Sequence, residues 1–254
     1  MKLRVLGCSG GIGAGLRSTS FLVDDDILID AGTGVGDLTL DEMTKIRHIF
    51  LTHSHLDHVG CLPLLVDSIF DRIEIPIVVH AQRNTIKALQ DHVFNWIMWP
   101  NFPELPYPDY PVMRYEPMEA GEVRTIGGRA FEMIPVNHIV PTVGYRVECD
   151  GKAFAYSGDT TTNDTFWDIL NAREALDVLI VETAFSRADE RLSRLARHYC
   201  STSLAADIKK LRHQPAVYLT HRKPGAEDVI LAECREAIKG HDLKQLSEGT
   251  LFQF

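Results

Sequence analysis

The most restrictive feature of the sequence is residues 52–58, Thr-His-Ser-His-Leu-Asp-His, which place three histidines and one aspartate within six positions, His53 to His58. A helix would set His53 and His55 roughly 200° apart, too far to share one metal ion. A sharp loop after a strand can bring them together, and the preceding apolar run, 48–51, is typical of a buried strand. Dense histidine and aspartate suit zinc, iron or manganese. The sequence therefore predicts a metal-binding loop at the end of a strand, against the alternative of a polar turn that is merely rich in histidine.

Length and composition predict one globular domain over residues 1–254. The chain is 45% hydrophobic and 24% charged, with no linker and no tandem repeat. Its five cysteines are odd in number, widely spaced and without a CxxC pair, which is typical of a reducing compartment. The first apolar run is too short for a signal peptide, and no run approaches the roughly 18 apolar residues of a membrane span. We therefore expect a cytoplasmic protein without a membrane partner.

The formal net charge of −9 argues against long nucleic acids as partners, since such proteins usually carry a basic excess. Bound metal ions would add positive charge that this count omits. A small anionic substrate remains compatible with the composition.

Short apolar runs alternate with helical patterns along the chain. The expected strands are 2–7, 20–23, 26–30, 48–51, 75–80, 129–136, 142–149, 153–156, 177–182 and 216–220. Apolar residues at helical spacing predict helices in segments 86–97, 204–211 and 228–239, the last with Gly240 as its C-terminal stop. This order favours two sheets covered by helices.

Two further segments are unusual. Residues 99–111, WPNFPELPYPDYP, contain too many prolines for a helix interior or a central strand. They predict an ordered loop that packs on the body or on a second subunit, or else a lid whose aromatic rings stack on the substrate. Residues 7–15 are rich in glycine but lack the GxGxxG spacing and a following helix, which indicates a turn near the active site and not a dinucleotide site.

Three later residues are candidates to complete the metal site. His138, Asp159 and His221 each follow an apolar run of strand type. Ligands at strand ends are held by a rigid scaffold. Each alone would more often be a surface residue, but three in succession after strands predict a common site with the early histidines.

This pattern resembles the metallo-β-lactamase fold superfamily. The resemblance implies a four-layer α/β fold, an αββα sandwich of two mixed β-sheets flanked by helices, with a pair of divalent metal ions, zinc first and iron or manganese as alternatives. The implied ligands of the first ion are His53, His55 and His138. Those of the second are Asp57, His58 and His221, and Asp159 would bridge the two.

Within the superfamily, the chain resembles class II 3′,5′-cyclic-nucleotide phosphodiesterases. The similar segments are 53–65, 99–102, 157–160 and 220–224. A more distant similarity to ribonuclease Z rests on residues 181–185 and on His198 with Ser201 and Thr202, although Tyr199 and Cys200 separate that histidine from the serine.

These resemblances imply hydrolysis of a small phosphodiester such as cAMP by a metal-bound hydroxide. Two ions about 3.5–4 Å apart can clamp the attacking and leaving oxygens. Asp57 would orient or deprotonate the water. The ribonuclease Z resemblance implies that His198 protonates the leaving oxygen while Glu182 fixes its tautomer, whereas the plainer alternative is that His198 caps the following helix.

Other interpretations stay open at this point. The same metals would serve ribonuclease Z-like RNA processing, a lactonase or a thioesterase, and a non-catalytic metal-binding member is a further alternative. Arg222 and Lys223 are candidates for phosphate contact or solvated surface charge. The arginines at 187, 191, 194 and 197 would form one basic stripe if that segment were helical. A homodimer is left open.

Overall fold

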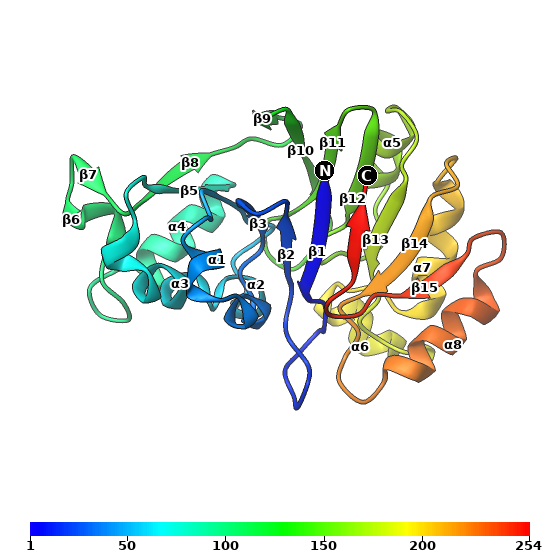
Figure 1. The fold of residues 1–254 in the computed structure, drawn as a ribbon. Helices are drawn as coiled ribbons and strands as arrows, with labels where there is room; N and C mark the ends of the chain where they lie inside the picture. Colours follow the sequence, from blue (N-terminus) through cyan, green and yellow to red (C-terminus); the bar gives the residue numbers. More distant parts are fainter.

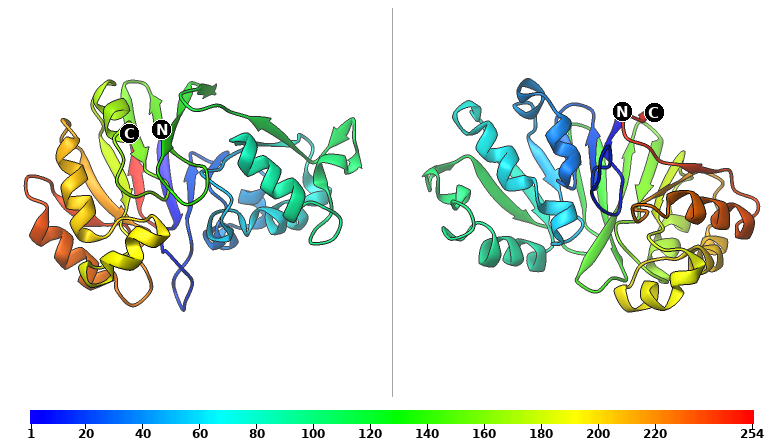
Figure 2. Two further views of the ribbon diagram at one scale, coloured as in Figure 1. Left: turned by 180° about the vertical axis from the view of Figure 1, so that it is seen from behind. Right: turned by 90° about the horizontal axis from the view of Figure 1, so that it is seen from below.

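The computed structural model describes residues 1–254 and consists of two seven-stranded sheets packed face to face, with helices on both outer surfaces (Figure 1). Seen from below, the blue and cyan helices lie on one side of the strands and the yellow and orange helices on the other (Figure 2). This confirms the predicted αββα sandwich. No helix combines the length and the apolar composition that a bilayer crossing requires.

The first sheet comes mainly from the N-terminal half. Its order is β16 (Leu251–Gln253), β1 (Lys2–Gly7), β2 (Ser20–Val23), β3 (Ile27–Ile29), β4 (His48–Phe50), β5 (Ile77–Ala81) and β8 (Met113–Pro117). Strands β16 to β3 pair antiparallel, and β3 to β8 pair parallel. The sheet is therefore mixed, as predicted.

The second sheet is mixed as well. Its order is β15 (Leu243–Gln245), β14 (Ala216–Thr220), β13 (Val178–Glu182), β12 (Lys152–Tyr156), β11 (Thr142–Cys149), β10 (Arg129–Val136) and β9 (Val123–Ile126). Strands β15 to β12 are parallel and β12 to β9 antiparallel. The parallel strands β12, β13 and β14 have their C-terminal ends side by side, and Asp159, Glu182 and His221 stand at or just after these ends.

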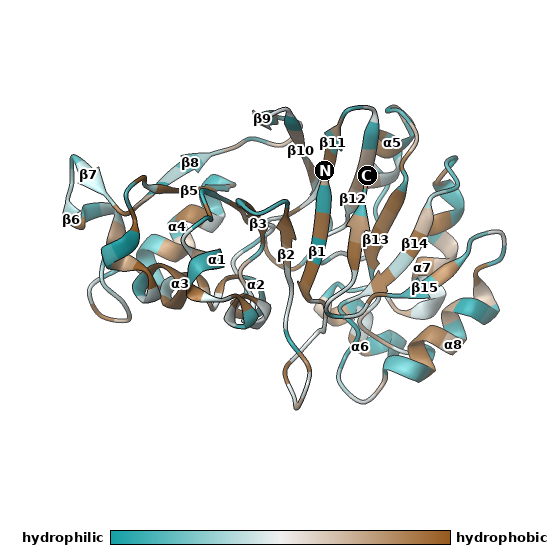
Figure 3. Ribbon diagram, viewed as in Figure 1, coloured by the Kyte–Doolittle hydropathy of each residue, from teal (hydrophilic) through white to brown (hydrophobic).

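Alternation along the strands builds three separate cores. In β2, Phe21 and Val23 face the core between the sheets, whereas Leu22 faces the helices on the outside. In β12, Phe154 faces the inner core and Ala155 faces the opposite helices. Successive strand residues point to opposite faces, so each strand joins two layers. Figure 3 shows brown, apolar residues along β1, β12 and β13.

The helices cover the outer face of each sheet. The α-helices are α1 (Leu40–Met43), α2 (Leu56–Val59), α3 (Leu62–Ser68), α4 (Arg83–His92), α5 (Thr165–Asn171), α6 (Glu190–Ala196), α7 (Ser201–Asp207) and α8 (Glu227–Ala237). Apolar residues of α1 to α4 pack on the first sheet, and those of α5, α7 and α8 pack on the second. Short 3-10 helices lie at Thr33–Asp37, Phe70–Arg72, Phe102–Glu104, Arg187–Asp189 and Ile208–Lys210.

The expected helix over 86–97 is too long, because α4 ends at His92. The side chain of Asn95 accepts hydrogen bonds from the amides of Ile97 and Met98, so the chain turns there and Ile97 is exposed. Helix α7 also ends early and continues as a 3-10 turn, and α8 ends at Ala237, three residues before Gly240. Strand β5 begins at Ile77 and not at residue 75.

The segment 99–111 packs on the body, as one of its predicted alternatives requires. Phe102 is buried against Phe94 and Phe70, and Trp99 packs on the same core. The segment ends in a small hairpin of β6 (Pro106–Tyr107) and β7 (Tyr110–Pro111). Figure 1 shows this hairpin at the far end of the first sheet, away from α2 and α6, which does not support the lid alternative.

The four arginines from 187 to 197 do not form one helical stripe. Arg187 lies in a 3-10 turn and bonds Glu236, α6 begins only at Glu190, and Arg197 leaves the helix in the left-handed region at φ 53°. The segment is therefore not one continuous helix, and the condition for a single basic stripe is not met.

Candidate metal centre

The histidine loop lies between β4 and α2, and a buried carboxylate organises it. Thr52 donates its amide and its hydroxyl to Asp30 at 2.8 and 3.0 Å. The second oxygen of Asp30 lies 2.7 Å from Nδ1 of His58. These bonds close the loop after the strand and turn Nε2 of His58 toward the other ligands. Asp30 is fully buried directly after β3, and it was not among the predicted site residues.

The structure brings the seven predicted ligands together in two groups that share Asp159. The first group is His53, His55, His138 and Asp159. The second is Asp57, His58, Asp159 and His221. Within each group the ligand atoms lie within 4.8 Å of one another.

Individual distances show how the two sheets meet at this centre. Nε2 of His138, after β10, lies 3.3 Å from Nδ1 of His55 in the loop after β4. An oxygen of Asp159, after β12, lies 3.3 Å from Nε2 of both His58 and His221. His221, after β14, also lies 3.2 Å from Asp57. Ligands that follow strands of both sheets therefore converge on one site.

Unpartnered buried atoms show that the site fits metal ions. Nε2 of His53, Nε2 of His58 and Oδ1 of Asp159 are buried without a hydrogen-bond partner. Buried polar atoms in folded proteins nearly always have a partner. Imidazole nitrogens and carboxylate oxygens are common ligands of zinc and of related divalent metals. Divalent cations would satisfy these atoms together.

Outer contacts fix the orientation of the ligand rings. Nδ1 of His138 lies 2.9 Å from the carbonyl oxygen of Arg197, and Nδ1 of His53 lies 3.0 Å from the Thr52 hydroxyl. Such bonds to the far nitrogen set the tautomer and the direction of the ligating nitrogen. Asp30 holds His58 in the same way. Outer contacts therefore orient three of the four histidines His53, His55, His58 and His138.

Burial and neighbouring charges favour the metal-binding protonation states of His53, His138 and Asp159. Burial lowers the pKa of His53 far below its ordinary value and lowers that of His138 to about 4. Burial alone would raise the pKa of Asp159, but His221 and His58 outweigh it, so the net pKa lies well below the usual range. Neutral imidazoles and an ionised bridging carboxylate are the metal-binding forms. Burial would also lower the pKa of His58, but Asp159 and Asp30 raise it well above its ordinary value, so a metal ion would displace a proton from that ring.

Glu182 and His198 form a second unit beside these groups. Nδ1 of His198 lies 2.9 Å from Glu182, which is fully buried at the end of β13. The carboxylate also accepts hydrogen bonds from the amides of Thr160, Ala184 and Tyr199. The His198 ring lies 4.7 Å from the His138 ring and 5.2 Å from the His221 ring. Burial would lower the pKa of His198, but Glu182 raises it above its ordinary value.

The glycine-rich turn after β1 supports His221 from behind. The amide of His221 donates to the carbonyl of Cys8 at 2.8 Å, and the amide of Gly10 donates to the carbonyl of Arg222 at 3.0 Å. A Cβ at Gly10 would come within 2.3 Å of the His221 carbonyl oxygen. The turn is therefore next to the centre, and only glycine fits at its closest approach.

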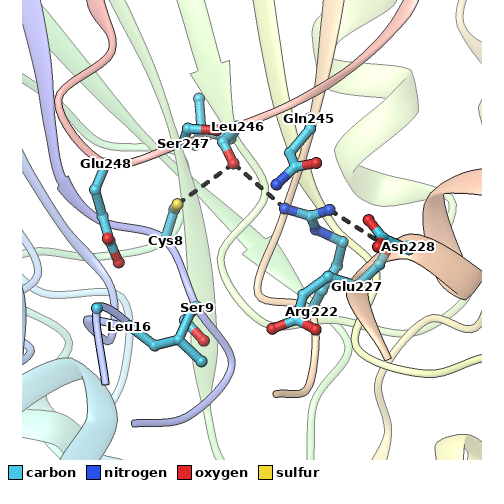
Figure 4. Close-up of a pocket in the computed structure, with 11 residues that line it drawn as sticks. Cys8, Ser9, Leu16, Arg222, Glu227, Asp228, Gln245, Leu246, Ser247 and Glu248 are labelled. Atoms are coloured by element: carbon cyan, nitrogen blue, oxygen red, sulfur yellow. Dashed lines mark hydrogen bonds between the residues drawn. The ribbon is translucent and has the colours of Figure 1, made fainter. Parts of the chain in front are cut away.

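Arg222 does not face the metal groups. Its guanidinium donates to the carbonyl oxygens of Leu246 and Glu227 in a separate pocket of about 400 Å³ behind the glycine-rich turn (Figure 4). Neither expectation for Arg222 is met, because its guanidinium is engaged away from the metal groups and the residue is only 5% exposed, so it is not solvated surface charge. Lys223 contacts the glycine-rich turn that supports His221, because its Nζ donates to the Gly10 carbonyl at 2.8 Å.

Comparisons with known proteins agree with this geometry. The family model described as the β-lactamase superfamily domain matches residues 25–222. A probable 3′,5′-cyclic-nucleotide phosphodiesterase of Yersinia pestis is 26% identical over 94% of this chain and 83% of its own length. A ribonuclease Z of Haloarcula marismortui is 22% identical over 94% of this chain and 93% of its own.

Among solved structures, unliganded yeast PDE1 is similar with a TM-score of 0.81 at 18% identity, covering 98% of each chain. At that identity the likeness speaks for the fold alone. The family match covers most of the chain and includes every ligand position from His53 to His221. The chain therefore belongs to the β-lactamase superfamily, and it is a metal-dependent hydrolase with the metallo-β-lactamase fold.

Proposed function

We propose that this hydrolase is a dinuclear phosphodiesterase that cleaves a small phosphodiester, with a 3′,5′-cyclic nucleotide such as cAMP as substrate. The observation that carries the proposal is the pair of four-residue groups joined through Asp159. Two metal sites that share a bridging carboxylate suit a phosphodiester, whose attacking and leaving oxygens lie on opposite sides of phosphorus. The relatives named as cyclic-nucleotide phosphodiesterases support the choice of substrate.

In this proposal the ligands are assigned as the two groups divide them. His53, His55, His138 and Asp159 would hold one ion, and Asp57, His58, His221 and Asp159 the other. Two divalent ions, zinc in our proposal, would supply positive charge and lower the pKa of bound water toward 7. Iron and manganese accept the same ligand types.

The residues around the ions would handle the protons. Asp57 is partly exposed and lies 3.2 Å from His221. The carboxylate of Asp57 would orient the water or accept a proton from it. His198 would give the proton on Nε2 to the leaving 3′-oxygen as the P–O3′ bond breaks. Glu182, fixed by three backbone amides, accepts from Nδ1 and thereby keeps a proton on each nitrogen of the charged ring.

RNA 3′-end processing is the second candidate, because a ribonuclease Z relative aligns with nearly the whole chain. The net charge of −9 weighs against it, since a tRNA precursor presents many phosphates to the protein. We therefore place a small diester first.

A turnover screen of the purified, metal-analysed protein tests the proposal. It compares cAMP, cGMP, 2′,3′-cyclic nucleotides, bis-(p-nitrophenyl) phosphate, a tRNA precursor and a lactone. We expect the fastest turnover with a 3′,5′-cyclic nucleotide. Rapid cleavage of the lactone with no cleavage of any phosphodiester would refute the proposal, and preference for the tRNA precursor would favour the second candidate.

A further inference from the structure

Three large apolar side chains in segments that lead into or out of the metal groups are exposed. Leu56 is 74% exposed, Ile139 is 58% exposed and Leu195 is 67% exposed. We call these residues the apolar rim. A single exposed leucine needs no explanation, but each member of the rim belongs to a segment that shapes the centre.

Leu56 and Ile139 each directly follow one of two histidines that contact each other, His55 and His138. Leu56 stands between His55 and Asp57 at the first position of α2, and Ile139 directly follows His138. The ring nitrogens of His55 and His138 are 3.3 Å apart. The two exposed side chains therefore branch from segments that come from different sheets and meet at the metal groups.

Leu195 belongs to α6, the helix that leads into the centre through Arg197. The helix buries only Ser193, and its C-terminal end is tied to the centre by Arg197. Nη1 of Arg197 donates to the carbonyl of His138 at 3.0 Å, while Nδ1 of His138 lies 2.9 Å from the carbonyl of Arg197. Figure 1 shows α2 and α6 at the same lower edge of the sandwich.

The charge around the rim fits a small ligand better than a long polyanion. Arg194 of α6 pairs with Glu190, and the guanidinium of Arg197 donates to the backbone carbonyl of His138, which leaves exposed Arg191 as the one arginine of this segment without such a contact. Recognition of a nucleic-acid backbone needs free basic side chains along its path. An apolar surface next to a phosphate-binding centre instead suits a flat, weakly polar group attached to the phosphate through a short spacer.

From this placement we propose that Leu56, Ile139 and Leu195 form the surface that binds the base of a mononucleotide. This inference rests on the proposed function and adds its specificity-determining residues. Contact between the base and the rim is expected to strengthen binding by about tenfold, the effect of burying a modest apolar area. The phosphate would be held by the centre, and the base by the rim.

Calorimetric titration of the metal-loaded protein with AMP and with ribose 5-phosphate tests the inference, because the two probes differ only by the base. The unmodified protein is expected to bind AMP about tenfold more tightly or better. The double variant Leu56→Ser/Ile139→Ser should bring the two affinities within about twofold of each other, with ribose 5-phosphate affinity and metal content unchanged. Leu251→Ser on β16, which pairs with Arg4 of β1, is the matched control and should keep the preference for AMP.

Equal affinity for both probes in the unmodified protein, or an unchanged preference in the double variant, would overturn the inference. Hydrolysis of bis-(p-nitrophenyl) phosphate is measured in parallel. A protein that prefers AMP through the rim but cleaves no phosphodiester would contradict the proposed function and leave the base-binding surface in place.

Discussion

At the scale of single residues, His198 is the side chain whose role can be tested most directly. It contacts Glu182 at 2.9 Å but is not among the predicted ligands. We expect His198→Ala to retain both metal ions and to lower cAMP turnover by about 10²–10⁴-fold. Steady-state kinetics together with metal analysis of the same sample measure both effects.

The leaving group provides the control for this variant. p-Nitrophenolate departs without a proton, so the loss in His198→Ala should be much smaller with bis-(p-nitrophenyl) phosphate than with cAMP. An equal loss with both substrates would show that His198 positions other groups and does not donate a proton. Unchanged turnover of cAMP would remove it from the mechanism.

Asp30 is the second residue with a definite prediction. Its carboxylate holds Nδ1 of His58 at 2.7 Å and also accepts the Thr52 amide. Because an outer partner of this kind orients the ligating nitrogen, Asp30→Ala should weaken the site of His58 by about 10–100-fold. Competitive metal titration should then show one tight site and one weak site. Two sites of unchanged affinity would contradict this role.

Asp30 also shows where sequence reasoning stops. The predicted ligands His138, Asp159 and His221 were found because each follows an apolar strand and has a ligand type. The expected strand 26–30 included Asp30, whereas the observed strand ends at Ile29, so Asp30 follows an apolar run as the other three do. Its function depends on a tertiary contact with His58, 28 positions away, which spacing in the sequence does not encode.

At the scale of elements, the glycine-rich turn has the narrowest tolerance. Gly10→Ala would place a Cβ at 2.3 Å from the His221 carbonyl oxygen, so the turn or His221 must move. A displacement of about 1 Å in a catalytic group can cost about 10² in rate. We expect a loss of that order and a weakened site at His221, seen in kinetics and metal titration.

Gly36→Ala is the matched control for this turn, since a Cβ there meets nothing within 4 Å. It should retain full activity. If Gly10→Ala were as active as Gly36→Ala, the close approach of the turn to His221 would not matter for activity.

The long strands were predicted from sequence more accurately than the ends and edges of the fold. Strands β1, β2, β10, β11 and β14 have the predicted bounds. Buried residues lie on both faces of these strands, so the apolar run in the sequence matches the strand. Strands β8, β9, β15 and β16 were missed. All four stand at the outer positions of their sheets, and all are short or partly exposed. Pairing with a neighbour, more than burial, makes them strands.

At the scale of the whole molecule, the metal ions are expected to join the two sheets. His53, His55, Asp57 and His58 come from the first sheet, and His138, Asp159 and His221 follow strands of the second. An ion at 100 times its dissociation constant stabilises the folded state by about 2.7 kcal/mol. For a chain of this size, one kcal/mol corresponds to about 2–4 °C in Tm.

Chelation should therefore lower Tm by about 5–10 °C for each ion removed, and adding zinc back should restore it. Differential scanning calorimetry with and without chelator measures the shift. The double variant Leu56→Ser/Ile139→Ser retains every ligand and should show the same shift. A Tm that is unaffected by chelation would mean that the ions do not hold the sheets together.

The pH dependence of stability has a source outside the metal centre, in the core between the sheets. His80 is fully buried, stacks on Phe50 at 4.4 Å and lies 3.0 Å from Nδ1 of His48. Burial lowers the pKa of His80 to about 3, and neighbouring His48, Arg124 and Arg114 act in the same direction. Glu122 opposes them, and Glu116 lies 3.8 Å from Nδ1. The folded protein therefore keeps this ring neutral.

The sign of the effect follows from the lowered pKa. The unfolded chain takes up a proton on this histidine below about pH 6.5, whereas the folded chain does not until about pH 3, so stability falls as the pH falls through that range. At pH 5 the loss is about 2 kcal/mol relative to neutral pH. His80→Phe keeps the aromatic stack without the titration, so its urea unfolding free energy in chelator should drop less between pH 7.5 and pH 5, by about that amount. Parallel losses in the variant and the unmodified protein would place the acid sensitivity in other groups.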